Sequence, residues 1–72
     1  MLSLLGERLK FLRQLHGYTQ KEVGEKLGVS PSVISGYEHG KPPSLERILL
    51  LTRIYGCSID YLLGKEAQAK NS

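Results

Sequence analysis

A tight turn around Gly28 constrains the fold of this 72-residue chain more than any other feature of its sequence. Before the turn, Thr19 and Glu22 are spaced as in a capping box, where each side chain accepts from the other residue's backbone N–H. Two residues after Gly28, Ser30 can cap a second helix, and Pro31 takes its first position, where a missing N–H costs little. The sequence therefore predicts two short helices joined by a turn with a positive φ, which glycine adopts readily.

Glycines follow the other apolar segments too, so the rest of the chain also reads as helices. We expect five helices, at residues 3–15, 19–27, 30–39, 44–55 and 59–63. Ser44 and Ser58 are the expected N-caps of the last two. No stretch alternates apolar and polar residues in the way that a half-buried strand does. The predicted fold class is therefore all-α.

Apolar residues recur at helical spacing, which predicts the buried face of each helix. In the first helix the expected stripe consists of Leu2, Leu5, Leu9 and Leu12, widened by Phe11 and Leu15. The expected inward residues of the next two helices are Val23, Leu27, Ile34 and Tyr37. In the fourth helix they are Leu45, Ile48, Leu49, Thr52 and Tyr55.

Size and charge favour a binding role. A chain of this length forms one domain and buries only about 60 % of its unfolded surface, which leaves little room for a deep catalytic cleft. The formal net charge is +3 and the sequence pI is about 9.2. A mild basic excess is compatible with a polyanionic partner, although alone it is equally compatible with a solvated surface.

Residues that could hold a metal or catalyse a reaction are scattered. The single cysteine, Cys57, can form neither an internal disulfide nor a zinc site, and His16 and His39 are isolated. The serines are explained as helix caps. We therefore expect no catalytic residue, metal or cofactor. The longest apolar run, residues 48–51, is far shorter than the ~20 residues that span a membrane, and we see no signal peptide, so we expect a cytoplasmic protein without membrane contact.

The combined spacing of several short motifs resembles the phage-repressor and Cro-like (XRE-type) helix-turn-helix regulators. The motifs are Leu9-Lys10-Phe11-Leu12-Arg13, Gly17-Tyr18-Thr19-Gln20, Leu27-Gly28-Val29-Ser30, residues 34–41, Pro43-Ser44-Leu45 and residues 59–64. They cover about residues 8–64, with the helix-turn-helix at 19–38. The resemblance implies a compact five-helix bundle of the lambda-repressor-like type over residues 1–64, followed by a polar tail or truncated linker at 65–72. It also implies a transcriptional regulator, a repressor, that reads double-stranded DNA through the helix Ser30–His39 in the major groove.

The resemblance further implies DNA-contact positions. Gln20 lies where family members anchor a phosphate and buttress the reading helix, and Thr19 and Ser44 begin helices whose N-termini can face phosphates. His39 and Lys41 are expected near the DNA backbone. The other expected contacts are Ser30, Pro31, Ser32, Val33, Ser35 and Gly36.

The expected base-reading positions, Ser32, Ser35 and Gly36, depart from the family's commoner choices. They include no Arg, Gln or Asn that could make bidentate contacts to a base. Pro31 and Val33 remain available for a thymine methyl. We therefore expect weak direct readout of bases.

The resemblance also assigns structural roles. Arg13 and Glu38 match family residues that form a partly buried ion pair between the first and third helices. Gly24 stands where alanine is usual, and a small residue there lets the second and third helices approach. We expect a homodimer on a two-fold operator, because one domain makes few base contacts. The segment Tyr61-Leu62-Leu63 belongs either to the core or to the dimer face.

A protein-interaction module with the same fold, such as an antitoxin or regulator subunit, is the alternative function. The weak base readers of the third helix favour it, whereas the basic charge and Gln20, Lys41 and Ser44 favour DNA. An enzyme is a distant third interpretation. Salt-dependent binding to random duplex DNA distinguishes the first two.

Overall fold

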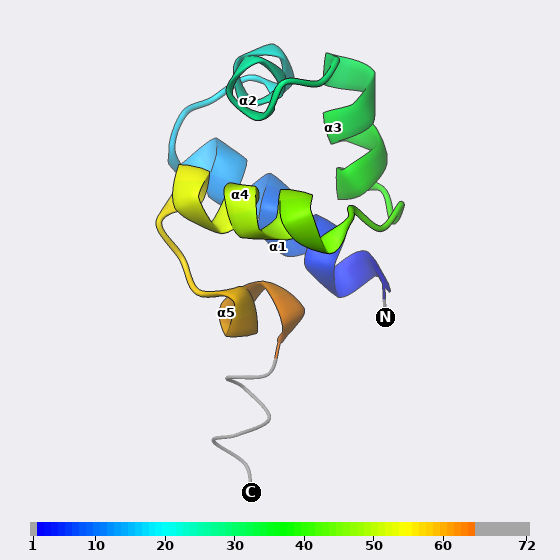
Figure 1. Cartoon of the computed structure of the whole chain (residues 1–72), viewed down its shortest axis with the longest axis vertical. Coiled ribbons are helices and arrows are strands. Elements are labelled where there is room, and N and C mark those ends of the chain that lie inside the picture. The colour runs from blue at the N-terminus through cyan, green and yellow to red at the C-terminus, as the bar shows by residue number, and fades with distance from the viewer. Residues whose placement is uncertain (1, 65–72) are drawn as a thin grey trace, which may run out of the picture.

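The computed structural model describes residues 2–64, which form five α-helices and no strand (Figure 1). The helices are α1 (Leu2–Leu15), α2 (Gln20–Leu27), α3 (Pro31–Glu38), α4 (Leu45–Tyr55) and α5 (Ile59–Leu63). The predicted all-α fold of five helices is confirmed. The tail or linker expected at residues 65–72 lies outside the described residues.

The helix starts follow from local capping. Thr19 Oγ1 accepts from the Glu22 N–H at 3.0 Å, and Glu22 Oε1 accepts from the Thr19 N–H at 2.8 Å, so the predicted capping box is confirmed. Ser30 is the N-cap of α3, but its side chain makes no capping hydrogen bond. The start of α3 therefore depends on Pro31, whose ring fixes the helical φ in advance.

The five helices enclose one small core. Both α3 and α5 pack on α1, α2 and α5 pack on α4, and α2 packs on α3. In Figure 1 the pair α2 and α3 lies at one end of the bundle and α5 at the other. The buried apolar residues are Leu9, Leu12, Val23, Ile34, Tyr37, Leu51, Tyr55 and Leu62.

Four of the leucine and phenylalanine positions predicted to be buried are exposed. Phe11 and Leu15 of α1 and Leu45 of α4 are more than half exposed, and Leu49 is nearly so. In α1, the contacts with α3 and α5 bury Leu9 and Leu12 and leave Phe11 and Leu15 outside. In α4, leucine occurs around most of the helix, and helical spacing alone does not say which sector faces the core. Contacts with α2 and α5 decide it, and they bury Leu51 instead.

Two helical glycines allow backbones to approach closely. A Cβ at Gly6 of α1 would lie 2.7 Å from the carbonyl oxygen of Glu38 and 2.8 Å from that of Tyr37, at the end of α3. A Cβ at Gly24 would lie 2.6 Å from the carbonyl oxygen of Val29. The close approach expected at Gly24 is thus present, but against the turn that leads into α3. The contact at Gly6 was not anticipated from the sequence.

We predict that Gly6→Ala destabilises the fold by about 1–3 kcal/mol. Alanine favours a helix by about 1 kcal/mol over glycine, but here its Cβ meets backbone that cannot move aside without shifting α3. Gly36→Ala is the matched control, because its Cβ meets only the flexible Lys41 side chain, at 3.3 Å. Urea denaturation should show the control as stable as the parent or more so. A Gly6→Ala variant of parental stability would contradict the close crossing of α1 and α3.

Candidate nucleic-acid interface

The turn between α2 and α3 fixes the angle at which α3 leaves the bundle. Gly28 has φ 84° and ψ 30°, in the left-handed region. The Gly24 carbonyl accepts from the N–H groups of both Gly28, at 2.7 Å, and Val29, at 2.8 Å. Val29 then packs against the core beside the start of α3, so the turn is held at both of its ends.

The exposed side of α3 presents small, weakly polar groups. Pro31 and Ser32 at its start are exposed, whereas Ser35 and Gly36 are half-buried. Val33 is half-buried because it packs against the core cluster, which leaves only part of its surface for another molecule. The side of α3 expected to read bases therefore carries hydroxyl and methylene groups and no charge.

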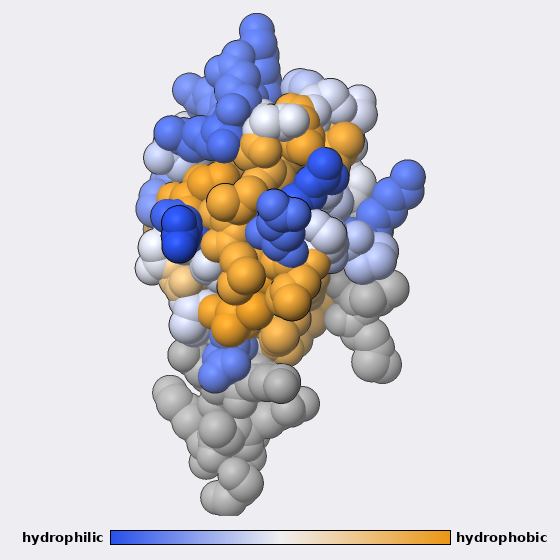
Figure 2. Space-filling model, in the orientation of Figure 1, coloured by the Kyte–Doolittle hydropathy of each residue, from blue (hydrophilic) through white to orange (hydrophobic). Residues whose placement is uncertain are grey.

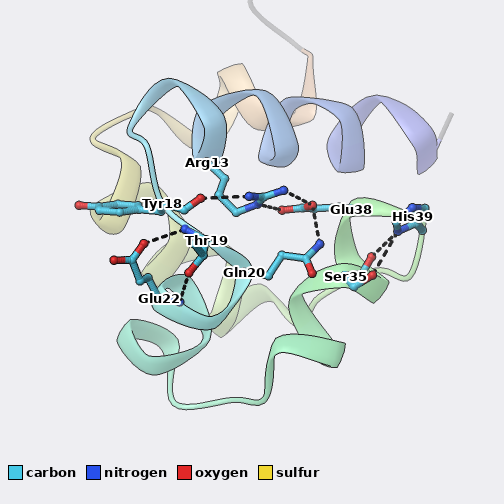
Figure 3. A network of polar contacts seen from close by, with 8 residues as sticks. All are labelled: Arg13, Tyr18, Thr19, Gln20, Glu22, Ser35, Glu38 and His39. Carbon is cyan, nitrogen blue, oxygen red and sulfur yellow. Dashed lines mark hydrogen bonds and ion pairs between the residues drawn. The ribbon is translucent and has the colours of Figure 1, made fainter.

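His39 is fixed against the last turn of α3. Its Nδ1 lies 2.7 Å from the Ser35 carbonyl oxygen and 3.4 Å from Ser35 Oγ (Figure 3). A carbonyl oxygen only accepts, so Nδ1 carries the hydrogen and donates it. The ring therefore has a defined orientation at the exposed end of the helix.

Lys41 packs its stem on the glycine of α3. The Lys41 N–H donates to the Gly36 carbonyl at 2.9 Å, which turns the chain back toward the helix. The side-chain carbons Cδ, Cβ and Cγ lie 3.3, 3.8 and 3.8 Å from the place that a Gly36 Cβ would take. The absent side chain at Gly36 thus makes room for Lys41 beside α3. This pairing could not be predicted, because nothing in the sequence links the two residues.

A buried ion pair holds the end of α3 to α1. Arg13 Nε lies 2.6 Å from Glu38 Oε2 and Nη2 lies 3.2 Å from Oε1, with Nη1 donating to the Tyr18 carbonyl at 3.0 Å (Figure 3). The Glu38 side chain is only 1 % exposed. The hydrogen bonds to Glu38 raise the pKa of Arg13, which remains charged. The predicted ion pair is confirmed, and it commits the guanidinium to positioning α3.

Gln20 joins the same network from α2. Its Nε2 donates to Glu38 Oε1 at 3.2 Å, so one carboxylate is shared by a residue of α1 and a residue of α2 (Figure 3). The contact supplies the buttressing of α3 that the family resemblance implies for this residue. A phosphate contact by Gln20 stays a prediction.

The remaining predicted site residues lie at helix starts. Thr19 and Ser44 are exposed N-caps, and both hydroxyls accept from backbone N–H groups, Thr19 from Glu22 at 3.0 Å and Ser44 from Arg47 at 3.3 Å. Each hydroxyl keeps its own hydrogen for donation. The structure therefore brings Gln20, His39 and Lys41 to the second half of α3, while Thr19 and Ser44 begin the helices on either side.

One contact that positions the interface was missed from the sequence. Arg47 Nη1 of α4 donates to the Tyr37 hydroxyl of α3 at 2.7 Å, and Tyr37 is otherwise a buried core residue. A tyrosine at core spacing signals burial, but its hydroxyl needs a partner that spacing does not reveal.

The predicted dimer segment lies mostly in the core. Leu62 is 0 % exposed, so of the two alternatives, core or dimer face, this residue belongs to the core. Tyr61 is half-buried beneath Arg8, whose guanidinium carbon lies 4.4 Å from the ring centroid and whose Nη1 donates to the Tyr61 carbonyl. Only Leu63 is exposed. The short α5 is anchored to α1, which turns the apolar segment inward.

Within residues 2–64, no group of three or more His, Cys, Asp or Glu side chains is placed to hold a metal ion. No helix in that range has the length and apolar character needed to cross a membrane.

The paired helices α2 and α3, the glycine turn and the three supporting helices define a helix-turn-helix protein. The family pattern described as helix-turn-helix matches residues 9–62, and the chain belongs to this family.

Named relatives agree with this assignment. The HTH-type transcriptional regulator ImmR of Bacillus subtilis (strain 168) is 45 % identical over 69 residues, which cover 94 % of this chain and 54 % of ImmR. Repressor protein C2 of Salmonella phage P22 is 35 % identical over 70 residues, covering 96 % of this chain and 32 % of C2. The chain thus spans about half the length of ImmR and a third of that of C2. The predicted resemblance to phage repressors is confirmed.

A solved structure shares the fold. The crystal structure of the P22 c2 repressor in complex with the synthetic operator 9T matches with a TM-score of 0.80 and 35 % sequence identity. The match covers 85 % of this chain and 94 % of that chain. The bundle predicted as lambda-repressor-like therefore has a repressor domain as its structural neighbour.

We predict that Arg13→Ala costs about 3 kcal/mol or more of stability, because it leaves the Glu38 carboxylate buried without its cation. Lys10→Ala on the exposed side of α1 is the matched control and should melt like the parent. Thermal melts followed by circular dichroism measure both. If Arg13→Ala kept the parental melting temperature and lost only nucleic-acid binding, Arg13 would be a contact residue rather than a support of α3.

Proposed function

We propose that this chain is a non-enzymatic, cytoplasmic transcriptional regulator, a repressor, that binds double-stranded DNA with α3 in the major groove. The observation that carries the proposal is the likeness to the P22 c2 repressor, whose structure was solved with an operator. The major groove is about 12 Å wide and admits a helix. The support of α3 by Arg13, Gln20 and Glu38 fits this role, because a reading helix must hold its orientation.

The proposed contacts fall into two groups. Bases are contacted from the exposed side of α3, through Ser30, Pro31, Ser32, Val33, Ser35 and Gly36. The DNA backbone is contacted through Thr19, Gln20, His39, Lys41 and Ser44. The second group is the stronger one, since it holds the cation of Lys41, the oriented ring of His39 and the N-termini of α2 and α4.

Direct readout contributes little in this proposal. A serine hydroxyl both donates and accepts, so Ser32 and Ser35 discriminate poorly between base pairs. Specificity then rests on thymine methyl contacts, bridging water and DNA shape. We expect a preference of about 10³ for the operator over random DNA, at the low end for such proteins.

Two copies are needed for useful affinity. A homodimer places two copies of α3 on the half-sites of a two-fold operator, about 34 Å apart. The domain over residues 1–64 is the unit that dimerises and binds in this proposal.

We predict that binding is strongly dependent on salt. Log K should fall by about 0.9 per phosphate contact for each tenfold rise in salt, so about eight contacts weaken binding by several decades. Lys41→Ala should weaken binding to every duplex about equally and reduce the slope by about one per copy. Gln20→Ala should likewise weaken binding without changing the preferred site.

Filter binding to an operator selected from a random pool and to a random duplex measures the salt effect, with Lys10→Ala as the control of equal charge. A salt-independent affinity would exclude the electrostatic mechanism. Absence of binding to both duplexes would instead favour the alternative, a protein-interaction module, for which the uncharged face of α3 is the supporting observation.

We also predict that Gly36→Arg tightens binding to every sequence and adds a preference for guanine, because it brings a second cation to the groove. The Lys41 stem must move aside for it, which a flexible chain does easily. Titrations against the operator and the random duplex compare it with Gly36→Ala, which moves the same stem without adding charge. If the arginine variant were folded but bound neither the operator nor the random duplex, α3 would approach the DNA too closely for any side chain at this position.

A further inference from the structure

The ring of His39 turns one of its two nitrogens away from α3. Nδ1 lies 2.7 Å from the Ser35 carbonyl oxygen, and because a carbonyl only accepts, this bond keeps a hydrogen on Nδ1 (Figure 3). The other nitrogen, Nε2, lies across the ring from this bond, and among the described residues it makes no hydrogen bond. His39 is exposed, so Nε2 is open to another molecule.

The hydrogen on Nδ1 decides what Nε2 can bind. In the neutral ring Nε2 only accepts, whereas in the imidazolium both nitrogens donate. A phosphate oxygen only accepts, so it can bind Nε2 only after the ring has taken up a proton. A neutral ring would instead suit a donor, such as the amino group of adenine or cytosine in the major groove. The two protonation states of His39 therefore select different groups of the DNA.

The position of His39 on α3 favours a phosphate. A reading helix contacts base edges with residues near its N-terminus. His39 is eight residues beyond Pro31, about 12 Å along the helix axis, which is about the width of the major groove. The ring lies on Ser35 and the Lys41 stem on Gly36, so a second basic side chain is held at the same end of α3. Figure 2 shows strongly hydrophilic surface beside this end of α3, whereas the hydrophobic surface in that view lies over α4.

Within residues 2–64, no carboxylate pairs with His39. The neighbouring Glu38 carboxylate is turned to Arg13 and Gln20, and the Arg13–Glu38 pair is the only ion pair in that range. The other charged residues beside this end of α3, all of them exposed, are Glu7 and Lys10 of α1, Lys21 of α2, Lys41 of the loop, and Glu46 and Arg47 of α4. Basic residues outnumber acidic ones among them, so an anion from outside the chain is the favoured partner of the ring.

We propose that His39 binds a DNA phosphate through protonated Nε2, so that the chain takes up protons from solution when it binds DNA. The inference rests on the proposed function and adds a regulation of its site by pH. Histidine changes its charge between about pH 5 and 8. The contribution of His39 to affinity is therefore fully present at the acidic end of this range and is lost as the pH rises through it. The bond from Nδ1 to Ser35 serves both protonation states, so the ring stays in place while its outward nitrogen changes.

Filter binding to the selected operator at about pH 6 and about pH 8, each over a range of salt, tests the inference. The parent chain should bind about tenfold more weakly per copy at the higher pH, because a hydrogen bond to a charged group is lost. Its salt slope should also be smaller there, by about 0.9 per copy, because one cation fewer meets a phosphate. Calorimetric titrations in two buffers of different ionisation enthalpy count the protons taken up.

Three variants separate His39 from other groups that titrate in this range. His39→Asn is the matched variant, because its amide can still donate to the Ser35 carbonyl while nothing replaces Nε2; it should bind equally at both pH values, as weakly as the parent at the higher one. His39→Lys stays charged and should keep the steeper salt slope at both. His16→Gln removes the other histidine, whose Nε2 lies 3.1 Å from the Tyr55 carbonyl oxygen, and should keep the parental pH effect. Circular dichroism confirms that each variant is folded.

An affinity that rises with pH would mean that neutral His39 accepts from a base, and it would overturn the inference. So would a pH effect that His39→Asn retains, or one that His16→Gln abolishes. Binding that depends on salt but takes up no proton leaves the proposed function standing and refutes the His39 contact alone. Absence of binding at either pH refutes both.

Discussion

The orientation of α3 depends on one nearly buried carboxylate, that of Glu38. It accepts from Arg13 of α1 and Gln20 of α2, so three helices meet at a single side chain. Burying a charge is costly unless its partners are in place, so the loss of one partner of this carboxylate would destabilise the arrangement. A nonpolar contact could also hold the helices together, but the hydrogen bonds to Glu38 add a directional constraint that the hydrophobic effect alone does not supply.

Much of the fold could be predicted from the sequence because its helix ends are set locally. The Thr19 capping box and the left-handed turn at Gly28 need no distant residue, and both lie where they were predicted. The buried side of α4 could not be predicted, because leucines lie around most of that helix and neighbouring helices choose among them. The contact at Gly6 was equally out of reach, since it involves the carbonyl oxygens of residues more than thirty positions away.

The candidate site, too, could be predicted from the sequence only in part. Family resemblance supplied the ion pair and the buttressing by Gln20, but it did not supply the hydrogen bond from Arg47 to the Tyr37 hydroxyl. That bond ties α3 to α4, so α3 is held by both its neighbours along the chain, α2 through Gln20 and α4 through Arg47. A rigid α3 suits a surface whose hydroxyl groups discriminate weakly, because only a fixed helix lets weak contacts add up.

The stem of Lys41 lies in the space beside α3 that a side chain at position 36 would need. A neutral base-reading side chain at position 36, such as glutamine, would occupy the space that now holds the lysine stem beside α3. In the proposed function, a reader there would shift the flexible lysine stem off α3, so a reading side chain at position 36 and a lysine packed on the helix exclude each other. Among relatives, positions 36 and 41 should consequently vary together, with a small residue at one accompanying a long basic residue at the other.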